Sequence, residues 1–193
     1  MDVGIDEAGK GCIFGPVYAA AVIWDSSIKH KYLKDSKKLS KGQKEIMYDF
    51  IVDNAIDYGI GYSTNIEIDN SNIHVANMNA MHRALDNLEL QYDHILVDGN
   101  IFTQYKDVPY TTVISGDNIH QNIMAASILA KVSHDNYIKQ LILQYNHLDV
   151  YKLEKNKGYG TSLHIEAVKE YGKTEYHRHS FKLQFEKQLM FFS

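Results

Sequence analysis

Hydrophobic positions follow two different spacings along this chain, and together they predict a mixture of strands and helices. Short apolar runs bounded by glycine or polar residues are typical of strands, and they predict strands over residues 3–6, 17–24, 58–64, 95–97 and 110–114. Apolar residues at helical spacing predict helices over residues 40–54, 73–88 and 119–145, and Ser40 is the expected N-cap of the first. Residues from Gly160 onward are predicted to be mainly helical.

The order of these elements predicts an α/β fold. The early part is strand-rich and the later part alternates strand and helix, which indicates a mixed sheet covered by helices. No repeat, low-complexity tract or proline-rich linker interrupts the 193 residues. We therefore expect a single domain over residues 1–193, with a helical C-terminal segment from about residue 160.

Composition narrows the class of protein. The chain is 45% hydrophobic and 23% charged, which is ordinary for a globular protein and excludes an intrinsically disordered one. A lone Cys12 excludes an intramolecular disulfide framework and a cysteine-rich zinc site. The start of the chain has neither the basic nor the apolar region of a signal peptide, and the longest apolar run, residues 17–24, is too short to span a membrane. These features predict a cytoplasmic protein.

Charge is unevenly distributed. The net charge of −4 does not indicate a nucleic-acid-binding protein, which usually has a basic surplus. Residues 29–44, however, contain seven lysines and only one acid, Asp35. This segment is either a solvated, lysine-rich loop and helix start or a patch that contacts phosphates.

Four acids stand where short apolar strands are predicted to end: Asp6, Glu7, Asp98 and Asp117. If their strands are neighbours, the carboxylates converge at one edge of the sheet. Clustered carboxylates repel one another unless a cation neutralises them. Hard oxygen ligands favour Mg²⁺ or Mn²⁺, and two such ions can promote cleavage of a phosphodiester.

Each acid also has a purely structural interpretation. Asp98 followed by Gly99 is a common turn sequence, and Asp117 is a suitable N-cap for the long helix that follows. Asp6 and Glu7 could form a solvated turn. Strand alternation would also point these two side chains to opposite faces, so both can serve one site only if the backbone bends at Glu7.

The sequence segments around these acids resemble those of the type 2 ribonuclease H family, ribonuclease HII. The similar segments, which span residues 4–181, are GIDEAGKG at residues 4–11, DSKKLS at 35–40, NMNAMHRAL at 77–85, VDG at 97–99, GD at 116–117 with AASILAKV at 125–132, KGYGT at 157–161, and HR at 177–178 with SF at 180–181. Their order makes a chance match implausible.

The resemblance implies a ribonuclease H-like fold, with a mixed five-stranded sheet flanked by helices and a helical C-terminal part. It implies a monomeric, metal-dependent endoribonuclease that hydrolyses the RNA strand of RNA–DNA hybrids. Such an enzyme also nicks 5′ of single ribonucleotides embedded in duplex DNA, leaving 5′-phosphate and 3′-hydroxyl ends. The metal-binding and catalytic acids carry over as Asp6, Glu7, Asp98 and Asp117. They would hold Mg²⁺ or Mn²⁺, two ions per site with substrate bound.

The resemblance also implies substrate contacts. The backbone of Gly9, Lys10 and Gly11 would contact the ribonucleotide 2′-hydroxyl, and Tyr159 would stack on a sugar. The family has arginine where this chain has Lys10; a backbone contact survives that change, but a bidentate phosphate contact does not.

Polar residues outside these motifs have expected roles of their own. Lys37 and Lys38 would contact phosphates, and Ser36 would either donate to a phosphate or cap a loop. Asp35 and Asp135 are each predicted to have a structural role, and Asp135 is expected to form an ion pair with a lysine. The histidines His164 and 177–179 lack the spacing of metal ligands and fit packing or surface roles better.

The end of the chain has two interpretations. Gln188, Leu189, Met190, Phe191 and Phe192 resemble the short motif by which bacterial replication proteins dock on the sliding clamp. The alternative is a helix end whose aromatic side chains pack on the core.

Two other functions remain as alternatives. The type 3 ribonuclease H cuts hybrid tracts but not single ribonucleotides, and the tyrosine at position 159 between two glycines argues against it. A non-catalytic hybrid-binding module would be expected to lack at least one of the four acids, all of which are present.

Overall fold

The computed structural model describes residues 1–30, 33 and 39–189, and side chains up to residue 186. Ser36, Lys37 and Lys38, for which phosphate contacts are predicted, lie outside the described residues, as does Asp35. So do Met190, Phe191 and Phe192 of the tail motif.

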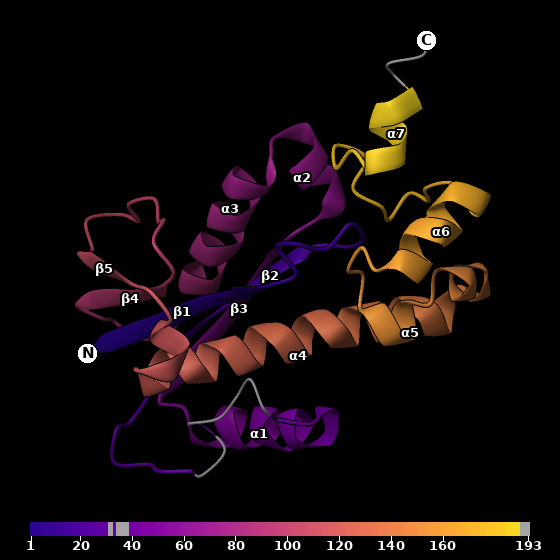
Figure 1. Cartoon of the computed structure of the whole chain (residues 1–193). Helices are drawn as coiled ribbons and strands as arrows, with labels where there is room; N and C mark the ends of the chain where they lie inside the picture. The colour runs from indigo at the N-terminus through magenta and orange to yellow at the C-terminus, as the bar shows by residue number, and fades with distance from the viewer. Residues whose placement is uncertain (31–32, 34–38, 190–193) are drawn as a thin grey trace.

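The chain builds a five-stranded mixed sheet with the order β3-β2-β1-β4-β5 (Figure 1). The strands are β1 (Asp2–Ala8), β2 (Val17–Ile23), β3 (Asp57–Ser63), β4 (His94–Asp98) and β5 (Tyr110–Val113). β2 pairs antiparallel with β1 and β3, whereas β4 pairs parallel with β1 and β5. The predicted five-stranded mixed sheet is confirmed.

Helices cover both faces of this sheet (Figure 1). Helix α3 (Ile73–Asp86) packs on the face that carries Val3 and Ile5 of β1, and α4 (Gln121–Gln144) packs on the other face. Helix α1 (Lys41–Asn54) covers α4 from outside. At Gly4 a Cβ would lie 2.4 Å from the α4 backbone at Asn122, so α4 begins directly against β1 only because this residue has no side chain.

The helix ends follow the expected capping chemistry. Ser40 caps α1 and forms a capping box with Gln43, so the predicted N-cap is confirmed. The short helix α2 (Asn65–Asn70), which periodicity does not reveal, has a second capping box built by Thr64 and Glu67.

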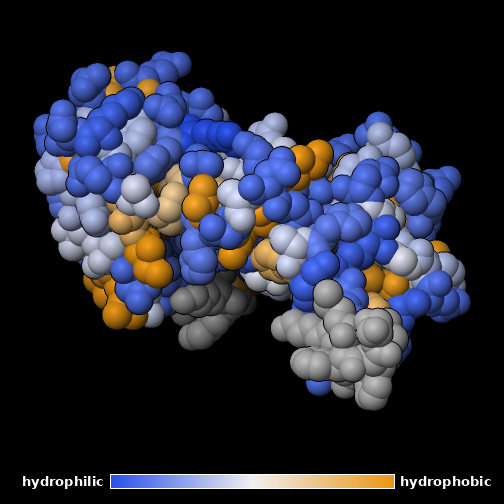
Figure 2. All heavy atoms as spheres, turned by 90° about the horizontal axis from the view of Figure 1, so that it is seen from above, coloured by the Kyte–Doolittle hydropathy of each residue, from blue (hydrophilic) through white to orange (hydrophobic). Residues whose placement is uncertain are grey.

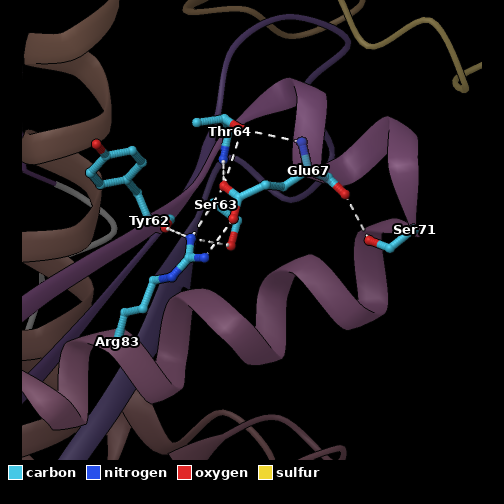
Figure 3. A network of polar contacts seen from close by, with 6 residues as sticks. All are labelled: Tyr62, Ser63, Thr64, Glu67, Ser71 and Arg83. Carbon is cyan, nitrogen blue, oxygen red and sulfur yellow. Dashed lines mark hydrogen bonds and ion pairs between the residues drawn. The ribbon is translucent and has the colours of Figure 1, made fainter.

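Arg83 of α3 anchors α2 to the edge strand β3 (Figure 3). Its guanidinium donates to Glu67 at 2.5 Å and to the carbonyl oxygen of Tyr62 at 2.7 Å. The hydrogen bond from Arg83 is the main cause that lowers the pKa of Glu67 to about 2. Arg83 of α3 thus links this helix to α2 and to β3.

The C-terminal part forms a third apolar cluster beyond the end of the sheet. It contains the 3₁₀ helix η3 (Asn146–Tyr151) and helices α5 (Leu153–Asn156), α6 (Ser162–Tyr171) and α7 (Gln184–Leu189), as Figure 1 shows at the right. The predicted helical C-terminal part is confirmed, and within it residues 172–183 are not helical because Gly172 at φ 82° ends α6. The chain then returns to the β1–β2 connection, where His177 pairs with Phe14.

The surface in Figure 2 is mostly hydrophilic, with apolar residues in small separate groups. Within the described part of the chain, no helix combines the length and apolar character needed to cross a membrane.

Candidate active site

Two parallel strands bring Asp6 and Asp98 to the same edge of the sheet. The pairing of β1 with β4 ends at Ile5 and Val97, so one further step along each strand places Asp6 beside Asp98. Both acids therefore follow buried strands at their carboxyl ends, the place where α/β sheets build ligand sites.

Asp117 joins them through a tight connection after β5. Ser115 adopts φ 57° and turns the chain into the 3₁₀ helix η2 (Gly116–Asn118). The backbone N–H of Asp117 then donates to Oδ1 of Asp98 at 3.3 Å, and the Asp117 side chain is buried. The N-cap of α4 is His120, so the interpretation of Asp117 as the cap of this helix is wrong.

Glu7 lies on β1 itself and not in a solvated turn. β1 stays paired with β2 as far as Ala8, so the backbone does not break at Glu7. Oε1 of Glu7 forms an ion pair with Nζ of Lys10 at 3.1 Å. Pairing with β4, by contrast, ends at Ile5, and the charge of Glu7 acts on Asp6, whose pKa it helps to raise.

The environment of Asp6 disfavours its charged form, and the residue is only 6% exposed. Burial raises the pKa of Asp6 well above its usual value, and repulsion by Glu7 and Asp98 raises it further. A hydrogen bond from Ser127 of α4 and one from the backbone N–H of Glu7, at 2.7 Å, act in the opposite direction. The ionised form of Asp6 is therefore unfavourable in this environment, and a bound cation would stabilise it.

The donor set suits a hard divalent cation in an open site. Within the described residues, no three His, Cys, Asp or Glu side chains are grouped tightly enough to hold a metal ion by themselves. Mg²⁺ usually takes only one or two carboxylates and completes its shell with water and substrate phosphates. Asp6, Asp98 and Asp117 fit that arrangement, in which substrate supplies part of the coordination.

Immediately after β1, a glycine turn is held in place by a buried arginine. Gly9 adopts φ 83°, and a Cβ there would lie 2.5 Å from the buried ring of His134. The guanidinium of Arg178 is fully buried and donates four hydrogen bonds to backbone carbonyl oxygens: Gly9 at 2.7 Å, Lys10 at 2.9 Å, Gly15 at 2.9 Å and Pro16 at 3.0 Å. These bonds fix the conformation of the turn.

Tyr159 lies against this turn. Residue 159 pairs with Cys12 in an isolated bridge, and a Cβ on Gly11 would be 3.9 Å from the Tyr159 ring. The side chain is 40% exposed, and the ammonium of Lys131 lies 5.3 Å from the ring centre. An exposed aromatic ring beside an accessible backbone turn is a suitable platform for a sugar or base.

His164 and His177 pack in the interior, which confirms the packing interpretation for these two histidines. Both rings are buried, and their Nε2 atoms lie 3.1 Å apart. His164 contacts the carbonyl oxygen of Tyr159 through Nδ1 at 3.0 Å. Asp135 pairs with Lys131 at 2.9 Å, as predicted, whereas exposed His179 lies at the surface.

Sequence reasoning missed two residues of this region. Arg178 was placed with the surface or packing histidines, and nothing in its local pattern reveals that it binds carbonyl groups more than 160 positions earlier. Ser127 lies within a segment of family resemblance, but only the packing of α4 on β1 brings it to Asp6.

Comparison with solved structures defines the class of fold. The fold is similar to that of ribonuclease H2 from Pyrococcus horikoshii OT3, with a TM-score of 0.75 at 22% identity over 97% of this chain and 96% of that chain. It is also similar to ribonuclease HII in the structure of the PCNA:RNase HII complex from Archaeoglobus fulgidus, with a TM-score of 0.75 at 24% identity, covering 94% and 93% of the two chains. The chain thus has a ribonuclease H-like fold.

Sequence comparison then gives the family. The family model for ribonuclease HII matches residues 3–184. Ribonuclease HII from Bacteroides thetaiotaomicron is 44% identical over 189 residues, covering 98% of this chain and 93% of that protein. Ribonuclease HII from Christiangramia forsetii is 46% identical over 180 residues, covering 93% and 89%. The chain belongs to the ribonuclease HII family and is an endoribonuclease of the ribonuclease H type, acting on RNA paired with DNA.

Proposed function

We propose that this enzyme nicks duplex DNA on the 5′ side of single embedded ribonucleotides and also cuts the RNA strand of continuous hybrids, leaving 5′-phosphate and 3′-hydroxyl ends. The observation that carries the proposal is the position of the glycine turn directly after the strand that bears Asp6 and Glu7. A group that can contact a 2′-hydroxyl and two of the acids that would hold the metal ions therefore belong to one continuous segment.

In this proposal, Asp6, Glu7, Asp98 and Asp117 hold the metal ions. Bound Mg²⁺ or Mn²⁺ would neutralise charge on the scissile phosphate and activate a water molecule. The crystal structure of the ribonuclease HIII from Bst in complex with Mn²⁺ shares the fold, with a TM-score of 0.70. Ser127 supports the carboxylate of Asp6 through its hydrogen bond.

The glycine turn and Tyr159 would read the ribonucleotide. The carbonyl oxygens of Gly9 and Lys10 accept hydrogen bonds from Arg178, which holds the peptide groups of the turn in one conformation. A hydroxyl that is present only in RNA can then be recognised by fixed backbone groups. Because backbone groups make this contact, it does not need an arginine side chain at position 10.

The C-terminal tail is proposed to dock on a sliding clamp. Its sequence resembles a clamp-binding motif from Gln188 onward, and a relative of the same fold has been solved in a complex with PCNA. Apolar residues at a chain end suit a hydrophobic groove on such a partner.

The decisive experiment uses a labelled DNA duplex with one embedded ribonucleotide, incubated with the enzyme in Mg²⁺, Mn²⁺ or EDTA. We expect nicking on the 5′ side with either metal, no nicking in EDTA, and a loss of at least about 10³-fold in the Asp98→Asn variant, because a metal-binding carboxylate is removed. The Asp107→Asn variant is the matched control, since this exposed acid belongs to the loop before β5 and should retain activity.

Two outcomes would change the assignment. Cleavage of a continuous hybrid without nicking of the single-ribonucleotide duplex would favour type 3 activity. Tight binding of both substrates without cleavage of either, in every metal, would favour a non-catalytic binding module.

A further inference from the structure

A hollow lined by lysines lies beside the proposed substrate-binding region, outside the four-carboxylate site. It has a volume of about 160 Å³, and its lysines come from three separate segments: Lys41 and Lys44 of α1, Lys139 of α4, and Lys157 of the turn after α5. We call these four residues and the space between them the lysine pocket. Convergence from three segments distinguishes the pocket from a solvated helix face.

The acids near the pocket do not neutralise it. Two acids, Glu45 and Asp135, line the pocket beside the four lysines, and the Asp135 carboxylate is engaged by Lys131 at 2.9 Å and contacts His134 at 3.1 Å. Among the described carboxylates, none forms an ion pair with any of the four pocket lysines. Burial lowers the pKa of Lys157; the charges of Asp135 and Glu154 oppose this shift, and those of Lys41 and Lys131 add to it. The pocket therefore gathers positive charge that an anion would stabilise.

The pocket is connected to the proposed ribonucleotide-binding region through short contacts. Lys131, the partner of Asp135, places its ammonium 5.3 Å from the centre of the Tyr159 ring. Lys157 precedes Gly158, whose carbonyl oxygen accepts a hydrogen bond from the N–H of Ile13 at 2.9 Å. A duplex whose ribonucleotide lies on the glycine turn and Tyr159 would thus have its neighbouring backbone near the pocket.

We infer that the lysine pocket binds a backbone phosphate of the duplex, on the side of Tyr159 away from the four acids. The inference rests on the proposed function for the presence of a duplex, and it adds a contact site in which Lys157 of the KGYGT segment is joined by Lys41, Lys44 and Lys139, which lie outside the similar segments. Lysine acts as a point charge, so the pocket would bind any sequence and would add affinity that depends on salt.

The test compares two double variants that lose the same amount of charge. Lys44→Gln with Lys139→Gln removes two pocket lysines, and Lys155→Gln with Lys182→Gln removes two exposed lysines elsewhere. Binding to the single-ribonucleotide duplex is measured by fluorescence anisotropy in EDTA, over a range of KCl concentrations. Losing one phosphate contact should lower the slope of log K against log salt by about 0.9 and weaken binding roughly tenfold at low salt, in the pocket variant only.

A neutral-backbone scan then locates the contact. Single methylphosphonate linkages are placed along the duplex, one per substrate. We expect one position at which the neutral linkage weakens binding by the wild type but not by the pocket variant, because both changes remove the same contact. Equal losses for both proteins at every position would overturn the inference, as would equal salt slopes for the pocket and control variants.

Nicking assays separate this inference from the proposed function. If the wild type nicks the duplex and the pocket variant shows an unchanged KM, the pocket inference fails and the proposed function stands. If the wild type binds but never nicks, the proposed function fails irrespective of the pocket. Lys139→Glu, a single change on an exposed position of α4, is the second variant should the double variant be unstable.

Discussion

At the scale of single residues, Arg178 shows how one buried side chain can organise a site far away in sequence. Its guanidinium satisfies four backbone carbonyl oxygens in the β1–β2 connection, including those of Gly9 and Lys10. Buried carbonyl groups need partners, and the planar fork of arginine reaches several at once. The glycines permit the turn, but the arginine selects its conformation.

The Arg178→Lys variant should therefore lose stability and discrimination together. Lysine cannot reproduce the fork, so at least one buried carbonyl would remain unsatisfied, with an expected loss of about 3 kcal/mol in the free energy of unfolding. Urea unfolding measures this loss. Nicking of the single-ribonucleotide duplex, assayed below the melting temperature, should fall more than cleavage of a continuous hybrid.

Arg83→Lys is the matched control, because Arg83 is the other arginine of the chain. Its ion pair with Glu67 is half exposed, so its replacement should cost no more than about 1 kcal/mol and leave substrate preference unchanged. A similar stability loss in both variants would argue against a special role for Arg178.

At the scale of elements, a pair of buried histidines joins the C-terminal segment to the turn that carries Tyr159. Nδ1 of His177 accepts from the N–H of Thr174 at 3.0 Å, so His177 must donate from Nε2 to His164. His164 then donates from Nδ1 to the carbonyl oxygen of Tyr159. This chain of hydrogen bonds requires both rings to be neutral.

The histidine pair should make stability depend on pH. Burial, aided by repulsion from His164, lowers the pKa of His177 to about 3, against about 6.5 in an unfolded chain. Between these values the unfolded state binds more protons, so the stabilisation is complete above about pH 6.5 and is lost as the pH falls towards 3. We expect the unfolding free energy to drop by about 2 kcal/mol from pH 7.5 to pH 5 through this residue.

Urea unfolding at several pH values checks this expectation. The pH-dependent drop should be smaller by about 2 kcal/mol in His177→Gln than in the wild type. His179→Gln, which removes an exposed neighbour, should keep the wild-type pH dependence. An unchanged drop in His177→Gln would show that other groups cause it.

Elements with strong patterns were predicted, and those that depend on distant contacts were not. The strands, α1, α3 and α4 follow from apolar spacing and caps, and Ser40 marks the start of α1. Helix α2 has only six residues, too few for a helical period, and depends on Arg83 of α3. Residues 172–183 leave the helical pattern because their partners lie in the β1–β2 connection.

At the scale of the whole molecule, the four proposed catalytic acids and the C-terminal end lie in separate parts of the fold. The acids lie at the end of β1 and β4 and in η2, whereas α7 follows the third apolar cluster (Figure 1). A partner bound at the tail would therefore leave the sheet edge accessible.

Deleting residues 188–193 should abolish binding to the sliding clamp and leave the nicking rate unchanged. Pull-down with purified clamp and the nicking assay measure the two effects. A truncated enzyme that melts several degrees lower, with no clamp binding by the full chain, would support the alternative in which the tail packs on the core. The Phe191→Ala variant with Phe192→Ala is the control for loss of the apolar anchors without loss of length.

The sequence by itself determined the class of fold and predicted the four acids and the glycine turn as the site, because apolar spacing, strand-end acids and short motifs are local properties of the chain. Only the tertiary structure decided that Asp98 lies beside Asp6, that Asp117 is no helix cap, and that Arg178 holds the turn. It also brought together the lysines of α1, α4 and the turn after α5. The physical reason is that strand register, burial and the convergence of charges arise from packing between distant segments, which no local pattern encodes.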